Sequence, residues 1–272
     1  RTIARLYTRI CCQYFHREVT HMTKALFRYK DRLITRLDLI DDADSEALMK
    51  NLASVTAPST VAFLNQHAYN LAQKDPELQQ RFADMTYLLR DGIGIKWACQ
   101  LNGREPKANM NGSDFIPQLV DHLLETTPCD YQFFAMGTRN PWLEKGAEQL
   151  FRHHSFHAVD GFQPTETYLD YLRQHCQQGR FPVILLAMGM PKQEEVARHM
   201  QAAIKGPALI ICGGAILDFA ANRFKRAPLL FRKAGMEWFY RLLKEPRRLA
   251  LRYVLGIPRF FYYLARNGMT AR

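Results

Sequence analysis

The chain has 272 residues and a formal net charge of +11 at pH 7. Its length fits one large domain or two small ones, and an apolar fraction of 47% is ordinary for a globular protein. No window of about 18 apolar residues is free of charge, so the sequence predicts no transmembrane helix. Six cysteines without CxxC spacing favour buried free thiols in a reducing compartment over a disulfide framework.

The positive charge is concentrated at the carboxyl end of the chain. From Arg223 to Arg272 there are 13 Lys and Arg against two acids, Glu237 and Glu245, whereas the rest of the chain has 24 basic and 24 acidic residues. The protein is therefore a near-neutral body with a strongly basic tail. Such a tail suits nucleic acid, anionic lipid or a phosphorylated substrate as the partner.

Short apolar runs alternate with helical patterns along the body. The runs are bounded by glycine or polar residues, as in strands that are covered on both faces. Helices are indicated between them by apolar residues at helical spacing, or by a cap and a first-turn proline as in Asn140-Pro141. The predicted strands are Val61–Leu64, Tyr87–Leu89, Tyr131–Met136, Phe156–Val159, Pro182–Gly189 and Ala208–Gly214, and the predicted helices include Asp41–Leu52, one ending at Gln73, Ile93–Leu101, Phe115–Glu125 with Ser113 or Asp114 as cap, and Thr165–Gln178.

This alternation predicts an α/β fold, a Rossmann-like and mostly parallel sheet with helices on both faces. We divide the chain into an N-terminal extension (1–40), a Rossmann-like core (41–222) and a basic, amphipathic helical C-terminal appendage (223–272). No internal repeat or low-complexity segment interrupts this pattern. His153, His154 and His157 lack partners at metal-ligand spacing, so no metal site is predicted.

The stretch from Pro182 to Arg226 contains two predicted strands that each end in glycine. Pro191 marks the first turn of the helix after the first of these strands. A strand, a tight glycine turn and a helix N-terminus together favour anion binding, because free backbone N–H groups point outward there. Neither turn has the full dinucleotide or P-loop pattern. From spacing alone, a site for a phosphorylated ligand and ordinary sheet architecture are both open.

Two polar residues follow predicted strands at the edge where open α/β sheets bind their ligands. Asn65 can act as a turn or cap residue, or can offer its amide to a ligand. Asp91 can cap the helix that begins near Ile93, or can accept a proton from an attacking hydroxyl or bind a sugar hydroxyl. Without further information the cap is the favoured interpretation of Asp91, because aspartate is common at that position.

The basic tail interleaves arginines with aromatic residues. In the segment Gly235–Lys244 the apolar residues follow helical spacing, and Glu245-Pro246 ends that pattern. Arg247–Leu255 and Pro258–Ala265 follow as further aromatic and basic segments. Basic residues beside aromatic ones at helical spacing are typical of helices that lie in a bilayer interface. Single-strand nucleic-acid binding and a basic helical cover over the core are the alternatives.

An ordered set of motifs carries a family resemblance that spans roughly Thr60 to Pro258. The chain resembles the WecG/TagA/CpsF glycosyltransferases, and its PKQE segment and its RAP…EW..RL..EP.R segment are specific when they occur together. The motifs are Asn65, Asp91-Gly92-Ile93-Gly94, Asn111-Gly112-Ser113-Asp114, Gly189-Met190-Pro191-Lys192-Gln193-Glu194, Gly213-Gly214 with Asp218-Phe219, Lys225-Arg226-Ala227-Pro228, and Glu237-Trp238-Phe239-Tyr240-Arg241-Leu242-Leu243-Lys244-Glu245-Pro246-Arg247-Arg248.

The resemblance implies a bacterial enzyme that extends a polyprenyl-diphosphate-linked saccharide with a sugar from a nucleotide-diphosphate sugar, here a UDP-sugar. Family members invert the anomeric carbon and need no metal or other cofactor. They combine a Rossmann-like core with a C-terminal appendage that meets the membrane. The implied location is peripheral, on the cytoplasmic face of the bacterial inner membrane, with an anionic lipid surface and no nucleic acid as partner. The oligomeric state is left open, a homo-oligomer included.

The resemblance also assigns roles to residues of this chain. It implies Asp91 as the catalytic base and Asn65 as its early asparagine, although the family's Thr-x-Asn pattern reads Phe63-Leu64-Asn65 here. One carboxylate base suffices for a single inverting displacement. The implied nucleotide-sugar-binding residues are Gly137, Gly189, Gln193, Gly213, Gly214 and Asp218, and the implied acceptor- and diphosphate-binding residues are Arg241, Arg248 and Arg252.

The sequence leaves the donor sugar open. Family members use N-acetylmannosamine, its uronic acid or glucose, and the extended N-terminus and aromatic tail suit a GumM-like glucosyltransferase of exopolysaccharide synthesis with UDP-glucose as donor. A second hypothesis is a non-catalytic basic protein that binds membranes or nucleic acid with an inactive Rossmann-like body. A Rossmann oxidoreductase is disfavoured because the chain lacks GxGxxG.

Overall fold

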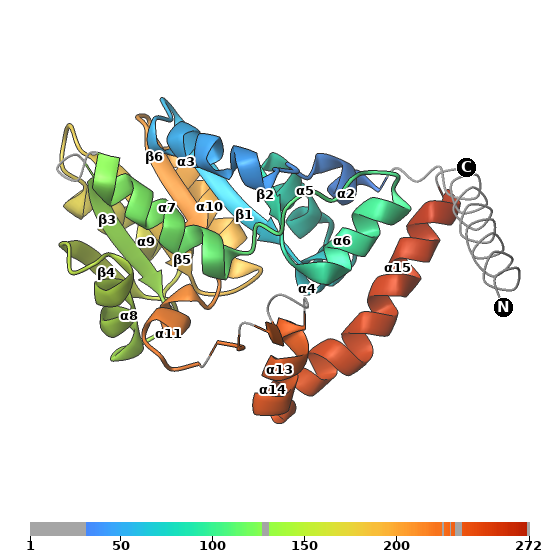
Figure 1. Cartoon of the computed structure of the whole chain (residues 1–272). Helices are drawn as coiled ribbons and strands as arrows, with labels where there is room; N and C mark the ends of the chain where they lie inside the picture. Colours follow the sequence, from blue (N-terminus) through green and yellow to red (C-terminus); the bar gives the residue numbers. More distant parts are fainter. Residues whose placement is uncertain (1–30, 127–130, 225, 229, 232–235, 271–272) are drawn as a thin grey trace, which may run out of the picture.

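The computed structural model describes residues 31–126, 131–224, 226–228, 230–231 and 236–270, with the side chains of residues 248 and 268–270 outside the description. Within these ranges the chain forms one six-stranded sheet of order β2-β1-β6-β5-β3-β4 (Figure 1), and every paired neighbour is parallel. The predicted Rossmann-like α/β class is confirmed. The strands are β1 (Pro58–Leu64), β2 (Tyr87–Arg90), β3 (Tyr131–Gly137), β4 (Phe156–Asp160), β5 (Phe181–Ala187) and β6 (Ala208–Cys212).

Helices pack on both faces of the sheet, and each face has its own apolar cluster. The layer with α3 and α7 lies on one side of the strands in Figure 1, and the layer with α9 and α10 on the other. One cluster includes residues of α3 (Ser45–Ala53), α7 (Gly112–Thr126), α8 (Trp142–Leu150) and α11 (Ile216–Ala220), and the other includes residues of α2 (Arg32–Arg36), α4 (Gln66–Ala72), α5 (Pro76–Asp84), α6 (Gly92–Leu101), α9 (Thr165–His175) and α10 (Lys192–Ala203).

The strands divide their side chains between the two clusters by simple alternation. In β1, Val61 and Phe63 join the cluster of α3 and α7, whereas Ala62 and Leu64 join the cluster of α4 and α10. All five residues of the central strand β6 are buried. Each fully buried aliphatic side chain contributes about 1.5–3 kcal/mol to the free energy of unfolding, which explains why continuous apolar runs mark these strands in the sequence.

The sequence patterns do not predict α5, although the signal for it is present. Asp75 caps this helix, because its Oδ1 accepts hydrogen bonds from the N–H groups of Glu77 and Leu78 at 3.0 and 3.1 Å. Pro76 then occupies the first turn. Leu78 and Phe82 are the buried residues of α5. Two apolar anchors in nine residues are too few to reveal the helical period, so the cap and the proline were the usable signal.

The C-terminal helices run back along the body (Figure 1). They are α13 (Glu237–Lys244), α14 (Pro246–Ala250), the π-helix η2 (Leu251–Leu255) and α15 (Gly256–Thr270). Pro258 lies in the first turn of α15, where a missing N–H costs little, and α15 follows η2 directly. Phe260, Tyr263 and Leu264 of α15 are buried in the same cluster as α4 and α10.

The division of the chain into three segments stays a prediction. Leu33 and Ile34 of α2, which we assigned to the N-terminal extension, are fully buried in the core. Among the described cysteines, Cys99 and Cys212 are buried, Cys176 is exposed, and all three are free. Cys11, Cys12 and Cys129 lie outside the described residues.

Within the described part of the chain, none of the helices combines the length and the apolar character needed to cross a bilayer. Residues 31–126, 131–224 and the described C-terminal segments also contain no group of three or more His, Cys, Asp or Glu side chains arranged to hold a metal ion.

Candidate functional site

The carboxyl ends of the parallel strands open onto two adjoining cavities. One has a volume of about 220 Å³ and lies against the C-terminal helices, and we call it the appendage cavity. The other has a volume of about 520 Å³ and lies against the turns after β3, β5 and β6, and we call it the glycine-turn cavity. The residues that line both cavities, and so form their boundary, are Asn65, His67, Asp91, Ser113, Arg241 and Arg252.

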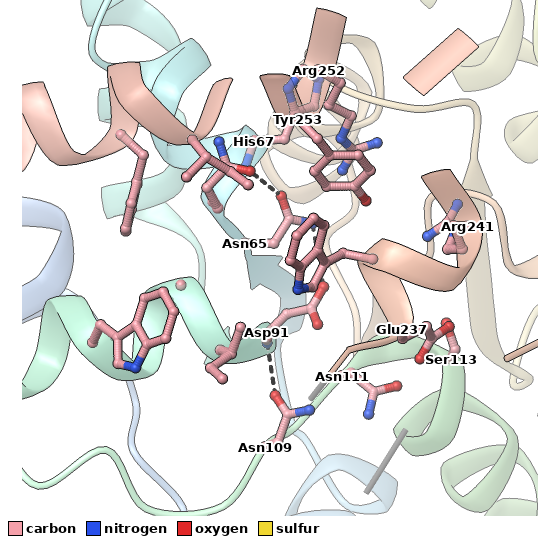
Figure 2. A pocket seen from close by; sticks show the side chains of 18 of the residues that line it. Asn65, His67, Asp91, Asn109, Asn111, Ser113, Glu237, Arg241, Arg252 and Tyr253 are labelled. Carbon is pink, nitrogen blue, oxygen red and sulfur yellow. Dashed lines mark hydrogen bonds between the residues drawn. The ribbon is translucent and has the colours of Figure 1, made fainter. Parts of the chain in front are cut away.

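Asn65 follows β1 and begins α4. Its Oδ1 accepts hydrogen bonds from the N–H groups of His67 and Ala68, each at 3.0 Å, which is the N-cap arrangement. Because the oxygen is held by the helix, the amide nitrogen must point the other way. Nδ2 donates to Oδ2 of Asp91 at 3.3 Å (Figure 2). Asn65 is therefore both a cap residue and a fixed amide donor at the boundary of the cavities.

Asp91 stands at the N-cap position of α6, but its side chain makes no capping hydrogen bond. The N–H of Gly92 instead donates to Oδ1 of Asn109 at 2.7 Å. The backbone of Asp91 is held by its own N–H, which donates to the carbonyl of Leu64 at 2.9 Å. The cap interpretation of this carboxylate is therefore wrong, because Asn109 supplies the oxygen. The carboxylate of Asp91 is left at the boundary of the two cavities (Figure 2).

The surroundings of Asp91 disfavour its charged form. Burial raises the pKa of this carboxyl above its ordinary value, and the nearby negative charge of Glu237 acts in the same direction. The hydrogen bond from Asn65 and the positive charges of Arg252 and Arg241 act in the opposite direction and only partly offset burial. A carboxylate whose pKa is raised toward neutrality is a better proton acceptor than an ordinary surface aspartate.

Two of the predicted glycines allow close packing at the strand ends. A Cβ atom on Gly137 would lie 2.2 Å from the carbonyl oxygen of Ala187, and one on Gly213 would lie 2.7 Å from Cγ2 of Ile216. Both distances are too short for any other residue type. Gly213 lines the glycine-turn cavity. Gly137 is not among the residues lining either cavity, so its visible role is to let β3 and β5 converge beside the site.

The other two predicted glycines have left-handed backbone angles, with φ of +80° at Gly189 and +61° at Gly214, and both line the glycine-turn cavity. The N–H of Gly214 donates to Oε1 of Gln193 at 3.0 Å, and the N–H of Gly213 donates to the carbonyl of Leu186 at 2.7 Å. The expected outward-pointing N–H groups are therefore engaged at these two residues. Their contribution to the cavity is its shape.

Asp218 binds two neighbours at the far side of the glycine-turn cavity. Its Oδ1 accepts hydrogen bonds from Oγ1 of Thr138 at 3.0 Å and from Arg223 at 2.9 Å. The guanidinium of Arg223 also lies 5.7 Å from the ring centroid of Trp142 and 5.3 Å from that of Phe224. This arrangement ties the turn after β3 to the segment after α11 and places an arginine, ion-paired with Asp218, on the cavity wall.

Two of the three predicted appendage arginines reach the boundary of the cavities. Arg241 of α13 lies over the ring of Phe219, 5.0 Å from its centroid, and its Nε is buried with no hydrogen-bonding partner among the described residues. Arg252 of η2 lies 5.7 Å from the ring centroid of Tyr253. The side chain of Arg248 lies outside the described residues, so its role stays a prediction.

The appendage cavity is lined by charged, polar and aromatic residues. Asp91, Arg241 and Arg252 are among them, and Tyr253 lies beside Arg252. Trp97 of α6 stacks on Phe261 of α15, with ring centroids 6.0 Å apart and each residue more than 40% exposed. The apolar and aromatic residues that line this cavity are Ile93, Trp97, Trp238, Tyr253, Ile257, Phe260 and Phe261.

Sequence reasoning missed three polar residues of the site. Burial, together with the charge of Arg252, lowers the pKa of His67 to about 4, so this imidazole is neutral at pH 7. Ser113 lines both cavities, and Arg223 lines the glycine-turn cavity. His67 lies two residues after Asn65 and Ser113 lies within a quoted motif, so proximity to a motif was the available signal for both. Arg223 lies five residues after Asp218, close to one turn beyond the end of α11.

Comparison with known protein families gives one match that covers most of the chain. The model of the Glycosyl transferase WecG/TagA/CpsF family matches residues 32–272. The matched span includes every strand of the sheet and both cavities.

Proposed function

The chain belongs to the WecG/TagA/CpsF glycosyltransferase family and is a glycosyltransferase of cell-envelope glycan synthesis, and we propose that it moves a sugar with inversion from a UDP-sugar to a polyprenyl-diphosphate-linked saccharide. The observation that carries this proposal is the position of Asp91. Its carboxylate is not used as a helix cap and lies where two cavities meet, beside Arg241 and Arg252.

In the proposed reaction an acceptor hydroxyl attacks the anomeric carbon of the donor sugar. The new bond joins the acceptor oxygen to that carbon, and the bond from the carbon to the diphosphate oxygen breaks. The hydroxyl proton passes to Asp91, and the bonding electron pair leaves with the nucleoside diphosphate. Asn65 donates to the carboxylate and holds its orientation. One base acting in one displacement inverts the anomeric carbon.

We assign the donor to the glycine-turn cavity. With about 520 Å³ it is the larger of the two, and Gly189, Gly213 and Gly214 keep its wall free of side chains. Arg223, Arg241 and Arg252 are cations on its lining, and arginine binds diphosphate oxygens well. In this proposal the guanidinium groups offset the charge of the leaving diphosphate without a divalent metal.

We assign the lipid-linked acceptor to the appendage cavity. Its arginines suit the acceptor diphosphate, and its aromatic residues suit the apolar lipid that follows. The C-terminal helices support a membrane-surface location, because they expose an apolar stripe at helical spacing formed by Leu251, Val254, Leu255 and Tyr262. Co-sedimentation with anionic vesicles tests the location, and an unchanged distribution between pellet and supernatant would contradict it.

A transfer assay tests the proposed function. A panel of UDP-sugars is combined with a polyprenyl-diphosphate-linked saccharide, and the product is identified by mass, with and without EDTA. We expect product from the native enzyme in both conditions, and a loss of about two to four orders of magnitude in kcat for Asp91→Asn, the usual contribution of a general base. Asp170→Asn removes an exposed carboxylate that pairs with Arg173 and is the matched control.

Three outcomes would each contradict a part of the proposal. Turnover by Asp91→Asn at the native rate would remove Asp91 from the base role. Absence of transfer from every UDP-sugar, with the protein folded, would remove the proposed donor class. A rate abolished by EDTA and restored by a divalent cation would overturn metal-independent charge compensation by the arginines.

A further inference from the structure

Glu194 is a buried acid behind the glycine-turn cavity. Its side chain is 1% exposed and it lines neither cavity, in contrast to its neighbour Gln193, which lines the glycine-turn cavity. The next residue, Glu195, lies 3.7 Å from Arg81 in an ion pair. A buried carboxyl group destabilises a fold unless its hydrogen bonds compensate for the lost water. The position of Glu194 therefore calls for an explanation that the proposed reaction does not supply.

One oxygen of the Glu194 carboxyl group has a hydrogen bond that leads to the cavity wall, whereas Oε2 is buried with no hydrogen-bonding partner among the described residues. Oε1 of Glu194 accepts from Nε2 of Gln193 at 2.8 Å, and Oε1 of Gln193 accepts from the N–H of Gly214 at 3.0 Å. A carboxamide has one donor end and one acceptor end. Because Glu194 accepts from the donor end, the acceptor end must face Gly214. If the carboxamide of Gln193 were rotated by about 180°, its NH2 group would face the N–H of Gly214. Two donors would then face each other, and this hydrogen bond would be lost.

The turn that Gln193 holds follows β6 directly. Gly214 has a φ of +61°, a conformation that glycine adopts easily but that needs an external contact to be selected over others. The hydrogen bond from its N–H to Gln193 is such a contact. Cys212 adds a second link between α10 and this strand end, since its Sγ donates to the carbonyl of Gln193 at 3.8 Å.

The residue before Gln193 acts on a different segment. Nζ of Lys192 donates to the carbonyl of Gly161, at 2.9 Å, and to that of Gln163, and so holds the segment after β4. The start of α10 thus organises two walls of one cavity. Only the contact to Gly214 depends on an amide whose orientation must be set by a further residue.

We propose that Glu194 is a positioning residue for the donor site, which fixes the carboxamide of Gln193 and through it the Gly213–Gly214 turn. Glu194 does not contact the substrate in this arrangement. Its role in donor binding rests on the proposed function, whereas its effect on the turn does not. The two parts can therefore be measured separately.

The first measurement is amide hydrogen exchange at Gly214 in the unliganded protein. Glu194→Leu cannot accept a hydrogen bond, and we expect exchange at Gly214 to become about tenfold faster, because the cost of an unpaired buried donor amounts to a factor of that order or more. Glu194→Gln keeps an acceptor oxygen, and we expect exchange within about twofold of the native rate. Glu195→Gln is the matched control on the same helix.

The second measurement is binding of uridine diphosphate, by calorimetry, in a double-mutant cycle. We expect Glu194→Leu and Gln193→Leu each to weaken binding by about tenfold, and the double variant to bind no worse than Gln193→Leu alone. Such non-additivity is expected if Glu194 acts on binding through Gln193. A purely structural role for Glu194 would give additive losses instead.

The outcomes separate this proposal from the proposed function. Additive losses, native exchange at Gly214 in Glu194→Leu, or a tenfold loss in Glu194→Gln would each overturn the positioning role. The last of these decides the question even if Glu194→Leu fails to fold. Failure of the native protein to bind uridine diphosphate would count against the proposed function, while the exchange measurement would still decide the role of Glu194.

Discussion

The two helical parts of the C-terminal appendage differ in how they are attached to the body. α15 contributes Phe260, Tyr263 and Leu264 to the main apolar cluster, and Asn267 near its end donates to Oδ2 of Asp31 at 2.7 Å. α13, in contrast, has no buried residue. It reaches the body through side chains such as Arg241, which lies over the ring of Phe219.

This difference shows that a basic, aromatic composition does not define one physical unit. α15 belongs to the core, because it buries large apolar side chains and donates hydrogen bonds to buried polar groups of the body. Both kinds of contact contribute to the free energy of unfolding. α13 belongs to the site, because its contribution is a set of side chains that line the cavities. Substitutions of the buried residues of α15 should therefore act first on stability, although Phe260 and Phe261 also line the appendage cavity, and those in α13 should act on activity.

The largest expected effect is on the free energy of unfolding, for a substitution in α15. Phe260→Ala removes a ring that is 2% exposed and packs edge-on against Tyr69, with ring centroids 5.3 Å apart. We expect a loss of about 3–5 kcal/mol in the free energy of unfolding, the usual cost of truncating a buried phenylalanine. Denaturant titration measures it, with Phe239→Ala in α13 as the matched control and an expected cost below about 1 kcal/mol. Equal losses would mean that the two helices are docked alike.

The next largest effect is on the transfer rate, for a substitution in α13. Arg241→Ala removes a guanidinium at the boundary of the two cavities, and we expect kcat to fall about 10²- to 10³-fold, as for loss of a charge-stabilising donor. The unfolding free energy should change by less than about 1 kcal/mol. Lys244→Ala removes an exposed cation from the same helix and is the control. A loss of stability without a loss of rate would reverse the assignment of α13.

The smallest effect tests how α13 changes the pKa of Asp91, the proposed base. Glu237 helps to raise the pKa of Asp91, so Glu237→Gln should lower that pKa. Because the base must be deprotonated to act, the acidic limb of the kcat/KM profile should move to lower pH, by less than about one unit. Glu245→Gln changes an acid of the same appendage that lines neither cavity and should leave the limb in place. A limb that moves upward or not at all would contradict the coupling.

The elements of the fold could be predicted where the sequence of one segment is enough to identify a strand or a helix. The six strands are apolar runs with polar or glycine ends, and burial on both faces makes such runs necessary in a parallel sheet. The register and the order of the strands were not readable, because they depend on which runs pair. α5 was missed because its two buried residues give a weak period.

The site was predictable by residue and not by arrangement. Residue types and motif order pointed to Asn65 and Asp91, but local statistics favoured a helix cap for Asp91. The contradicting residue, Asn109, lies 18 positions further along the chain. The meeting of the cavities likewise depends on residues from β1, β2, α7 and the appendage, which come together only through the tertiary fold. The engaged N–H of Gly214 could not be foreseen, because its partner Gln193 lies on α10, 21 residues earlier in the chain.

One short helix connects the start of α15 to Asp91, the proposed base. α4 begins at Asn65, which donates to Asp91, and Nδ2 of Asn70 in the same helix donates to the carbonyl of Gly256 at 2.7 Å, where α15 starts. A seven-residue helix is about 10 Å long and does not stretch. If the stripe formed by η2 and Tyr262 of α15 rests on lipid as proposed, the carboxylate is held at a constant height above the bilayer. The enzyme would then use a rigid spacer to select acceptors whose free hydroxyl extends the right distance from the carrier.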